Sequence, residues 1–338
     1  MRLTVDRREV GLRAAHAAAH GTVERRELFS VELEGADGVC GRGEAAPLES
    51  YDGVPGGLVA AALAEHARVL AALDDDATGP QILDACRRVA DLPQAVAAVD
   101  LALWDRAGRR AGRPVARLLA DDPAQRVEVN ATIGALDRGG AADAAAAAAG
   151  AGFRAVKVKV GVGDDAGRVA AVRALAGPEM LLRLDANGAW GSVDEAVATI
   201  AALAPAGLEL VEEPVHGIEA LRAVRARVPV RIAMDETAAE HGALASAATD
   251  AVCLKVGRCG GISATLAAAA LVRALGGEVY LASALDGPLG IAAALHCAAA
   301  LRVEAPCGLA TLALLELDDP FPVADGAIAV PSAPGLMP

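Results

Sequence analysis

The feature that most constrains the fold is a regular alternation of short β-branched runs with alanine-rich stretches, which begins near residue 127. Each run has six or seven residues and ends in polar side chains, as buried parallel strands often do. The runs span residues 127–133, 155–160, 181–187, 208–214, 230–236, 251–256, 278–283 and 303–308. Strands that alternate with helices form parallel sheets, and eight such units close into a barrel. The predicted fold class is therefore α/β, with a (β/α)7-8 TIM-like barrel.

The stretches between these runs predict the helices of the barrel. They span residues 141–149, 165–175, 192–203, 218–227, 262–275 and 291–301. The segment 240–248, between the fifth and sixth runs, is short and is the weakest helix candidate.

The first 120 residues have a different pattern, which predicts a separate unit. Segments 3–12, 24–34 and 38–44 are typical of an antiparallel meander, and helical patterns follow at 58–73, 81–90 and 94–107. No low-complexity linker follows them, so we expect the two parts to pack together. We predict an α+β capping domain over residues 1–120, joined by the C-terminal tail 320–338, and a catalytic barrel over residues 121–319.

The charge balance disfavours several classes of partner. The chain has 31 Lys and Arg against 44 Asp and Glu, a net charge of −13, which argues against binding to nucleic acid or to an anionic membrane. Charges and glycines interrupt every apolar stretch before the ~20 residues of a membrane span accumulate. The six cysteines form no C-x-x-C motif, and we interpret them as reduced, buried thiols of a cytoplasmic protein. An acidic chain that binds an anion needs a local positive group, such as a metal ion.

Carboxylates and lysines occupy five successive strand ends. In a parallel barrel the active site lies at the C-terminal ends of the strands, so these residues are the candidates for catalysis. They are, in strand order, Lys157 and Lys159, Asp185 and Asn187, Glu212 and Glu213, Asp235 and Glu236, and Lys255. Strand alternation allows only one member of each acidic pair to point inward, and the pattern leaves open which one.

This set of residues indicates a particular chemistry. Three converging carboxylates suit a hard divalent ion such as Mg²⁺, and lysines on either side of it face a bound anion from two directions. The arrangement suits abstraction of a proton α to a carboxylate, with lysine as the base and the metal stabilising the ene-diolate.

The motifs KVKV, LDANGAW, VEEP, AMDE and LKVGRCGG resemble the muconate-lactonizing branch of the enolase superfamily over nearly the whole chain. GRGEAAP and AVAAVDLALWDRAGRRAGRPVARLL resemble the capping domain of that family and its junction with the barrel. The resemblance implies a small-molecule carboxylate substrate and leaves homo-oligomer formation open. It also implies that Lys159 and Lys255 are catalytic and that Asp185, Glu212 and Asp235 bind Mg²⁺, for which Mn²⁺ can substitute.

Within this branch, SALDGPLGIAAALHCAAAL and CGLAT are similar to o-succinylbenzoate synthases. Those enzymes dehydrate 2-succinyl-6-hydroxy-2,4-cyclohexadiene-1-carboxylate in menaquinone biosynthesis. Dipeptide epimerases of the branch usually carry D-x-D at the end of the eighth strand, where CGLAT has none, although Asp318 and Asp319 lie further along. The alternatives are a dipeptide epimerase, an N-acylamino acid racemase, a muconate-type cycloisomerase or a non-catalytic metal-binding homologue. The expected substrate contacts are Lys157, Asn187, Ser283 and Gly308.

Two further expectations concern the cap. The segment 48–53 looks like the second of the family's mobile capping loops. His16 and His20 lie four residues apart, as a metal pair on a helix would, but their segment is typical of a loop or strand end. We therefore interpret them as surface histidines.

Overall fold

A computed structural model of the chain describes residues 1–18, 21–74 and 76–338, with the side chains of residues 15–18 left out. The interpretation of His16 and His20 as surface side chains falls outside this described part. Within it, no helix combines the length and the apolarity that crossing a membrane requires.

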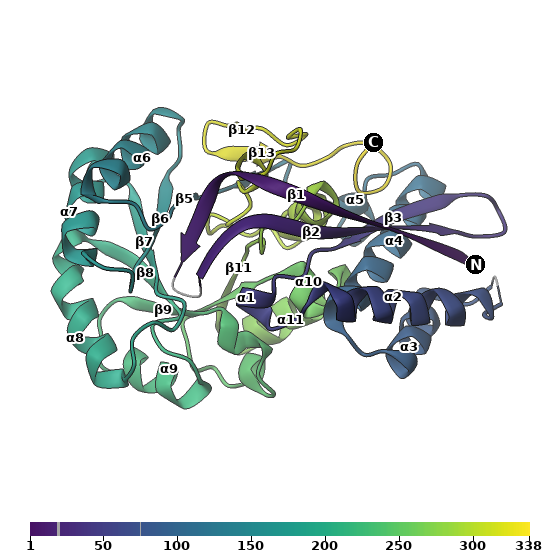
Figure 1. The fold of residues 1–338 in the computed structure, drawn as a ribbon, viewed down its shortest axis with the longest axis horizontal. Coiled ribbons are helices and arrows are strands. Elements are labelled where there is room, and N and C mark those ends of the chain that lie inside the picture. The colour runs from purple at the N-terminus through teal and green to yellow at the C-terminus, as the bar shows by residue number, and fades with distance from the viewer. Residues whose placement is uncertain (19–20, 75) are drawn as a thin grey trace.

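The larger part of the molecule is a curled parallel sheet with helices on its outer face (Figure 1). Its seven strands lie in sequence order: β5 (Ala131–Ile133), β6 (Ala155–Lys159), β7 (Leu181–Asp185), β8 (Leu208–Glu212), β9 (Arg231–Met234), β10 (Ala251–Leu254) and β11 (Glu278–Leu281). The outer helices include α6 (Arg138–Gly150), α7 (Asp165–Ala176), α8 (Val193–Leu203), α9 (Ile218–Arg225), α11 (Ile262–Ala274) and α12 (Pro288–Ala300). The predicted TIM-like α/β fold is confirmed.

The strands of this sheet are buried on both faces, which explains their apolar, β-branched composition. On β6, Val156 and Val158 belong to the same core cluster as Val169 and Val172 of α7. The residues that alternate with these valines face the interior of the curled sheet, so this face is free to carry polar side chains.

The predicted eighth strand, 303–308, is reduced to single bridges. Gly308 pairs with Ala282 beyond β11, and Cys307 pairs with Val129 ahead of β5. Pro306 has no N–H to donate, so the ladder does not extend backwards from Cys307. The segment still closes the barrel, because the N–H of Ser283 donates to Gly308 at 3.0 Å and the N–H of Asn130 donates to Cys307 at 3.0 Å.

The predicted first strand, 127–133, is divided in two. Its first part, β4 (Arg126–Glu128), pairs antiparallel with β13 (Ala327–Ala329), which forms a hairpin with β12 (Val323–Ala324). Only the second part, β5, joins the parallel sheet. The chain end then reaches the cap, where the N–H of Leu336 donates to Asp105 at 2.7 Å.

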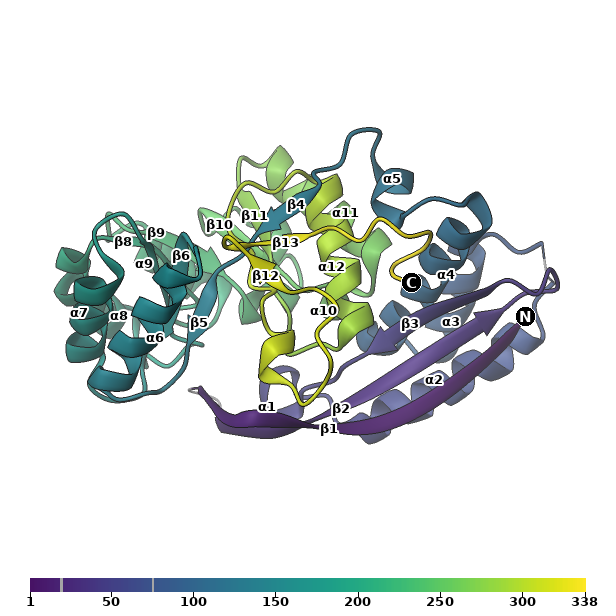
Figure 2. The same cartoon turned by 90° about the horizontal axis from the view of Figure 1, so that it is seen from above.

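The N-terminal part is an antiparallel sheet covered on one side by helices (Figure 2). Its strands are β1 (Arg2–Ala18), β2 (Gly21–Glu34) and β3 (Cys40–Ala45), and β1 and β2 are longer than predicted. The helices are α1 (Glu49–Asp52), α2 (Gly56–Ala71), α3 (Gly79–Val89), α4 (Pro93–Ala111) and α5 (Val115–Leu119). Gly43 lets β3 lie directly on α4, since a Cβ there would overlap the carbonyl oxygen of Ala98. Residues 48–53, predicted as a loop, contain the one-turn helix α1.

The segment after β9 has no α-helix before β10. Two 3-10 helices, η2 (Glu236–Ala239) and η3 (Ala243–Ala245), take its place, which agrees with the weak helical signal there. The six cysteines are free thiols. Cys86, Cys253, Cys297 and Cys307 are buried as predicted, whereas the prediction is wrong for Cys40, which lies exposed at the start of β3.

Candidate active site

Three buried lysines stand at the C-terminal ends of barrel strands. Lys157 and Lys159 lie on the inner face of β6, and Lys255 follows the last residue of β10. They are the only lysines of the chain, since the other 28 of its 31 basic residues are arginines. Each is 7–8% exposed, so their charges need partners within the site.

Asp185, at the end of β7, is the partner of two of these lysines. Its Oδ2 atom forms an ion pair with Lys157 at 2.8 Å and accepts a hydrogen bond from Lys159 at 2.7 Å, and its Oδ1 atom accepts the N–H of Asn187 at 3.1 Å. Burial raises the pKa of Asp185, but the two ammonium groups outweigh it and hold that pKa well below its usual range. Lys159 also donates to Oδ1 of Asn187 at 2.8 Å.

Glu212, at the end of β8, faces the same interior. Its Oε1 atom accepts a hydrogen bond from Lys157 at 2.9 Å, and its Oε2 atom accepts the hydroxyl of Tyr280 at 2.7 Å. Burial and the carboxylate of Asp185 raise the pKa of Glu212 to about 7. The positive charges near Glu212 are therefore not enough to offset the cost of burying its carboxylate.

Glu213 turns away from the lysines. Its Oε2 atom accepts the N–H of Asp235 at 2.8 Å, and its Oε1 atom accepts the N–H of Thr237 at 3.0 Å and lies 3.0 Å from Nδ1 of His216. Of the first acidic pair, Glu212 therefore contacts Lys157, and Glu213 accepts hydrogen bonds from the backbone that follows β9.

The second acidic pair departs from strand alternation. Asp235 accepts a hydrogen bond from Lys255, and Oε1 of Glu236 accepts the side-chain N–H of Asn187 at 2.8 Å, so both residues lie at the cluster. Alternation ends here because β9 stops at Met234 and Asp235 caps the 3-10 helix η2. Burial and the carboxylate of Asp235 raise the pKa of Glu236 to about 8.

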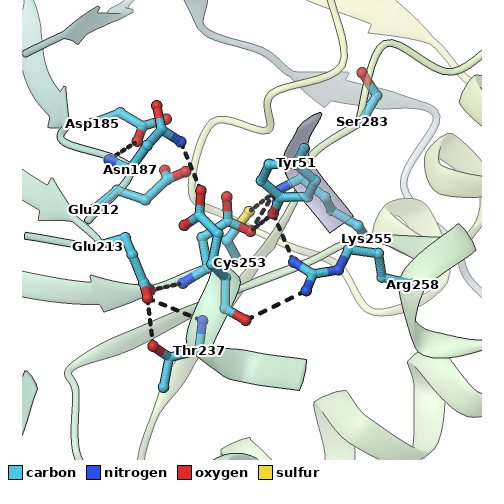
Figure 3. Close-up of polar contacts among 12 residues, drawn as sticks. Tyr51, Asp185, Asn187, Glu212, Glu213, Thr237, Cys253, Lys255, Arg258 and Ser283 are labelled. Atoms are coloured by element: carbon cyan, nitrogen blue, oxygen red, sulfur yellow. Dashed lines mark hydrogen bonds and ion pairs between the residues drawn. The ribbon is translucent and has the colours of Figure 1, made fainter. Parts of the chain in front are cut away.

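Tyr51 brings the cap into the site, and the sequence analysis did not identify it. Its hydroxyl donates to Oδ1 of Asp235 at 2.7 Å and accepts from Lys255 at 2.7 Å and Arg258 at 2.9 Å. Figure 3 shows Tyr51 against Lys255 and Arg258, whose charged groups lie 4.6 and 4.8 Å from its ring centre. The rarity of tyrosine could have drawn attention to this residue, because the chain has only two tyrosines, Tyr51 and Tyr280.

The carboxylates of the site fit a hard divalent cation. Oxygens of Glu212 and Asp235 and the sulfur of Cys253 lie within 4.8 Å of one another. Among the described residues, Asp185 belongs to no such cluster of possible metal ligands, and its Oδ2 atom forms ion pairs with the two lysines of β6. Oε2 of Glu236 is buried and has no partner within the described chain. Mg²⁺ prefers oxygen ligands such as carboxylates, and the unpartnered oxygen of Glu236 adds one more carboxylate oxygen to the site.

One cavity connects these residues with the expected substrate contacts. Besides Lys159, Asp185, Asp235 and Lys255, it is lined by Tyr51, Thr132, Lys157, Asn187, Ser283, Gly308 and Thr311. Glu212 is fully buried and is not part of the cavity wall. Ser283 and Thr311 share a hydrogen bond of 2.6 Å across its far side. The structure thus brings together all nine residues predicted to be catalytic, to bind the metal or to contact the substrate. Eight of them line the cavity, and the ninth, Glu212, lies behind its wall and accepts a hydrogen bond from Lys157.

Comparisons with known proteins agree with this arrangement. Residues 2–120 match the mandelate racemase / muconate lactonizing enzyme N-terminal domain, and residues 140–336 match the enolase C-terminal domain-like family. An o-succinylbenzoate synthase of Mycobacterium bovis is 42% identical over 218 residues, which are 61% of this chain and 64% of that enzyme. The matching region thus covers less than two thirds of that relative. A hydrophobic dipeptide epimerase of Enterococcus faecalis is 32% identical over 310 residues, 87% of this chain and 85% of that enzyme.

Solved structures show the same likeness. The Enterococcus faecalis dipeptide epimerase complexed with Mg and L-Leu-L-Tyr has a TM-score of 0.89 at 28% identity, covering 99% of this chain and 98% of that one. The L-Ala-D/L-Glu epimerase of Bacillus subtilis has a TM-score of 0.90 at 29% identity, covering 100% and 98%. From the two matched domains and the 32% identity over most of its length, the chain belongs to the mandelate racemase and muconate lactonizing enzyme family of the enolase superfamily.

Proposed function

We propose that the protein is a magnesium-dependent o-succinylbenzoate synthase, which removes water from 2-succinyl-6-hydroxy-2,4-cyclohexadiene-1-carboxylate. The observation that carries the proposal is the placement of Lys159 and Lys255 on opposite sides of a row of buried carboxylates. A lysine on each side can serve a substrate whose carboxylate lies between them. The 42% identity to o-succinylbenzoate synthases supports this choice of substrate.

Asp185, Glu212 and Asp235 are the residues that would hold Mg²⁺. When bound, the ion would offset the negative charge that develops on the substrate carboxylate as the α proton leaves. Mn²⁺ shares the preference for oxygen ligands, and we expect it to substitute.

Lys159 acts as the base and then as the acid. Its Nζ atom takes the proton from the carbon next to the carboxylate, while Asn187 and Asp185 hold Nζ in place. The resulting ammonium returns that proton to the hydroxyl group that departs from the same face of the ring. One C–H and one C–O bond break, a ring double bond forms, and water leaves, so no oxidant or reductant is needed.

Lys255 stays an ammonium throughout. Burial lowers the pKa of Lys255, but the carboxylate of Asp235 outweighs it and raises that pKa above its ordinary value. A permanently charged group at this position stabilises the ene-diolate by its field. The hydroxyl of Tyr51 contacts Lys255 from the side of the cap, and Arg258 of the barrel donates to the same hydroxyl.

A second candidate is an epimerase or racemase that acts on dipeptides or N-acylamino acids. The 32% identity to a dipeptide epimerase over 87% of the chain favours it, and two opposed lysines could exchange a proton across a substrate. Against it, the closing segment of the barrel contributes Gly308 and Thr311 to the cavity, neither of which carries a carboxylate that could pair with a substrate ammonium. Asp318 is exposed, and Asp319 accepts the N–H of Phe321 at 2.8 Å.

The decisive experiment is a direct assay with purified protein and Mg²⁺. The cyclohexadiene substrate should be converted to o-succinylbenzoate, and Lys159→Met should abolish conversion while Arg154→Met, a surface control, leaves it unchanged. A fully active Lys159→Met variant contradicts the mechanism. Exchange of solvent deuterium into dipeptides or N-acylamino acids, without any dehydration of the cyclohexadiene, decides for the second candidate.

A further inference from the structure

A second, smaller cavity lies between the cap and the barrel, behind Lys255. Polar residues of both parts line it: Glu44, Asp52 and Gln94 from the cap, and Lys255, Arg258 and Asp286 from the barrel. Its volume of about 20 Å³ is enough for one water-sized occupant.

Two buried oxygen atoms at this cavity have no hydrogen-bond partner among the described residues. Glu44 is 4% exposed; its Oε1 atom accepts the N–H groups of Gly287 at 2.7 Å and Gly290 at 3.3 Å, and its Oε2 atom has no partner. Gln94 is 6% exposed; its side-chain amide donates to Asp52 at 2.9 Å, and its Oε1 atom has no partner. Because an unsatisfied buried acceptor is costly, the two oxygens indicate a missing occupant.

No direct ion pair holds the carboxylates at this cavity. Within the described chain, no lysine, arginine or histidine nitrogen lies within 4.0 Å of a carboxylate oxygen of Glu44, Asp52 or Asp286. Arg26 of the cap, whose charge acts on Asp286 and Asp52 from a distance, donates its hydrogen bonds to the carbonyls of Ala46, Pro47, Ala284 and Leu285. Lys255 and Arg258 are engaged with Tyr51. A water molecule would satisfy the two acceptors but would put no positive charge in direct contact with these carboxylates.

We propose that the cavity binds a monovalent metal cation, Na⁺ or K⁺, through Oε2 of Glu44, Oε1 of Gln94 and the carboxylate of Asp286. Oxygen donors of this kind suit alkali cations, and the neighbouring positive groups of Lys255 and Arg258 disfavour a divalent one. Glu44 also holds the start of α12 through Gly287 and Gly290, so the ion would fasten β3 of the cap to a helix of the barrel.

A proton is the natural competitor for such a cation. Burial and the carboxylate of Asp286 raise the pKa of Glu44 to about 7, and burial raises the pKa of Asp286 to about 6. The charged groups that face this pair are Arg8, Arg26, Asp52, Lys255 and Arg258.

Thermal unfolding tests this proposal without any assay of activity. The protein is kept in EDTA at pH 8.5 and constant ionic strength, with chloride salts of Na⁺, K⁺ or N-methylglucamine. We expect Na⁺ or K⁺ to raise Tm saturably by about 3 °C or more relative to N-methylglucamine. Glu44→Gln and Asp286→Asn should lose this response, while the exposed-carboxylate control Glu304→Gln keeps it.

A crystal soaked in Rb⁺ or Tl⁺ locates the ion directly. Anomalous density between Glu44 and Gln94 is the expected result. Equal Tm values in all three salts, or an ordered water in place of the anomalous peak, overturns the proposal. If Glu44→Gln does not fold, Asp286→Asn and Gln94→Met provide the same comparison. Both variants keep Glu44, and with it the hydrogen bonds from Gly287 and Gly290.

Discussion

Lys157 and Lys159 form ion pairs with the same atom, Oδ2 of Asp185, at 2.8 and 2.7 Å. Asp185→Asn would leave both ammonium groups without that carboxylate in a buried site. Removing one partner of a buried ion pair costs about 3–5 kcal/mol, so we expect a lower free energy of unfolding in urea. We also expect weaker Mg²⁺ binding by calorimetry and loss of dehydration.

The control for that variant is Asp194→Asn, which removes an exposed carboxylate paired with Arg227 at the surface. It should change the free energy of unfolding by less than about 1 kcal/mol. An Asp185→Asn variant with wild-type stability and wild-type Mg²⁺ affinity would show that the shared oxygen is unimportant.

Tyr51→Phe tests the contribution of the cap to the site. The change removes the hydroxyl that joins Asp235, Lys255 and Arg258 but keeps the ring beneath the two cations. Losing hydrogen bonds to charged groups costs about 1.5–3 kcal/mol, so kcat should fall roughly 10- to 100-fold. Trp104→Phe, which removes a hydrogen bond to Ser263 outside the cavity, is the matched control. An unchanged kcat for Tyr51→Phe refutes a positioning role.

His296 makes stability depend on pH. Burial lowers the pKa of His296 to about 4, and the neutral ring accepts the N–H of Ala116 at 3.1 Å and donates to the carbonyl of Leu336 at 2.9 Å. The unfolded chain therefore binds more protons between pH 6.5 and 4, and stability falls as pH decreases through that window. At about 1.4 kcal/mol per pH unit, the contribution amounts to roughly 3 kcal/mol.

Urea unfolding between pH 8 and pH 4 measures this effect. The wild type should lose stability more steeply below pH 6.5 than His296→Gln, in which the titrating ring is gone. His241→Gln, at an exposed histidine, should follow the wild type. Parallel pH profiles for the wild type and His296→Gln would assign the acid sensitivity to other groups.

Gly43→Ala should separate β3 from α4. The new Cβ would meet the carbonyl oxygen of Ala98, a backbone atom that cannot move aside cheaply. Overpacking of this kind costs about 1–3 kcal/mol or more, so we expect Tm to fall by several degrees. Gly57→Ala is the control, because nothing lies within 4 Å of its Cβ. A Gly43→Ala variant as stable as Gly57→Ala would contradict this packing.

The seven parallel strands and the nine predicted site residues were accessible from the sequence for one physical reason. Residues at strand ends such as Asp185 and Lys255 are placed by the barrel topology itself, so local pattern and global position agree. The prediction failed where tertiary contacts decide. The segment 303–308, predicted as an eighth strand, is held by single bridges, and Tyr51 reaches Asp235 from 184 residues away in sequence. No local pattern encodes either relationship.

The confinement of all three lysines to the barrel mouth also affects how the chain is digested. A protease that cuts only after lysine has three target bonds, all at buried positions of the barrel, so cleavage of the native protein requires the barrel to open. An arginine-specific protease has 28 targets, many of them exposed, and reports local fraying instead. Comparing the two digestion rates thus separates opening of the barrel from motions elsewhere in the same molecule.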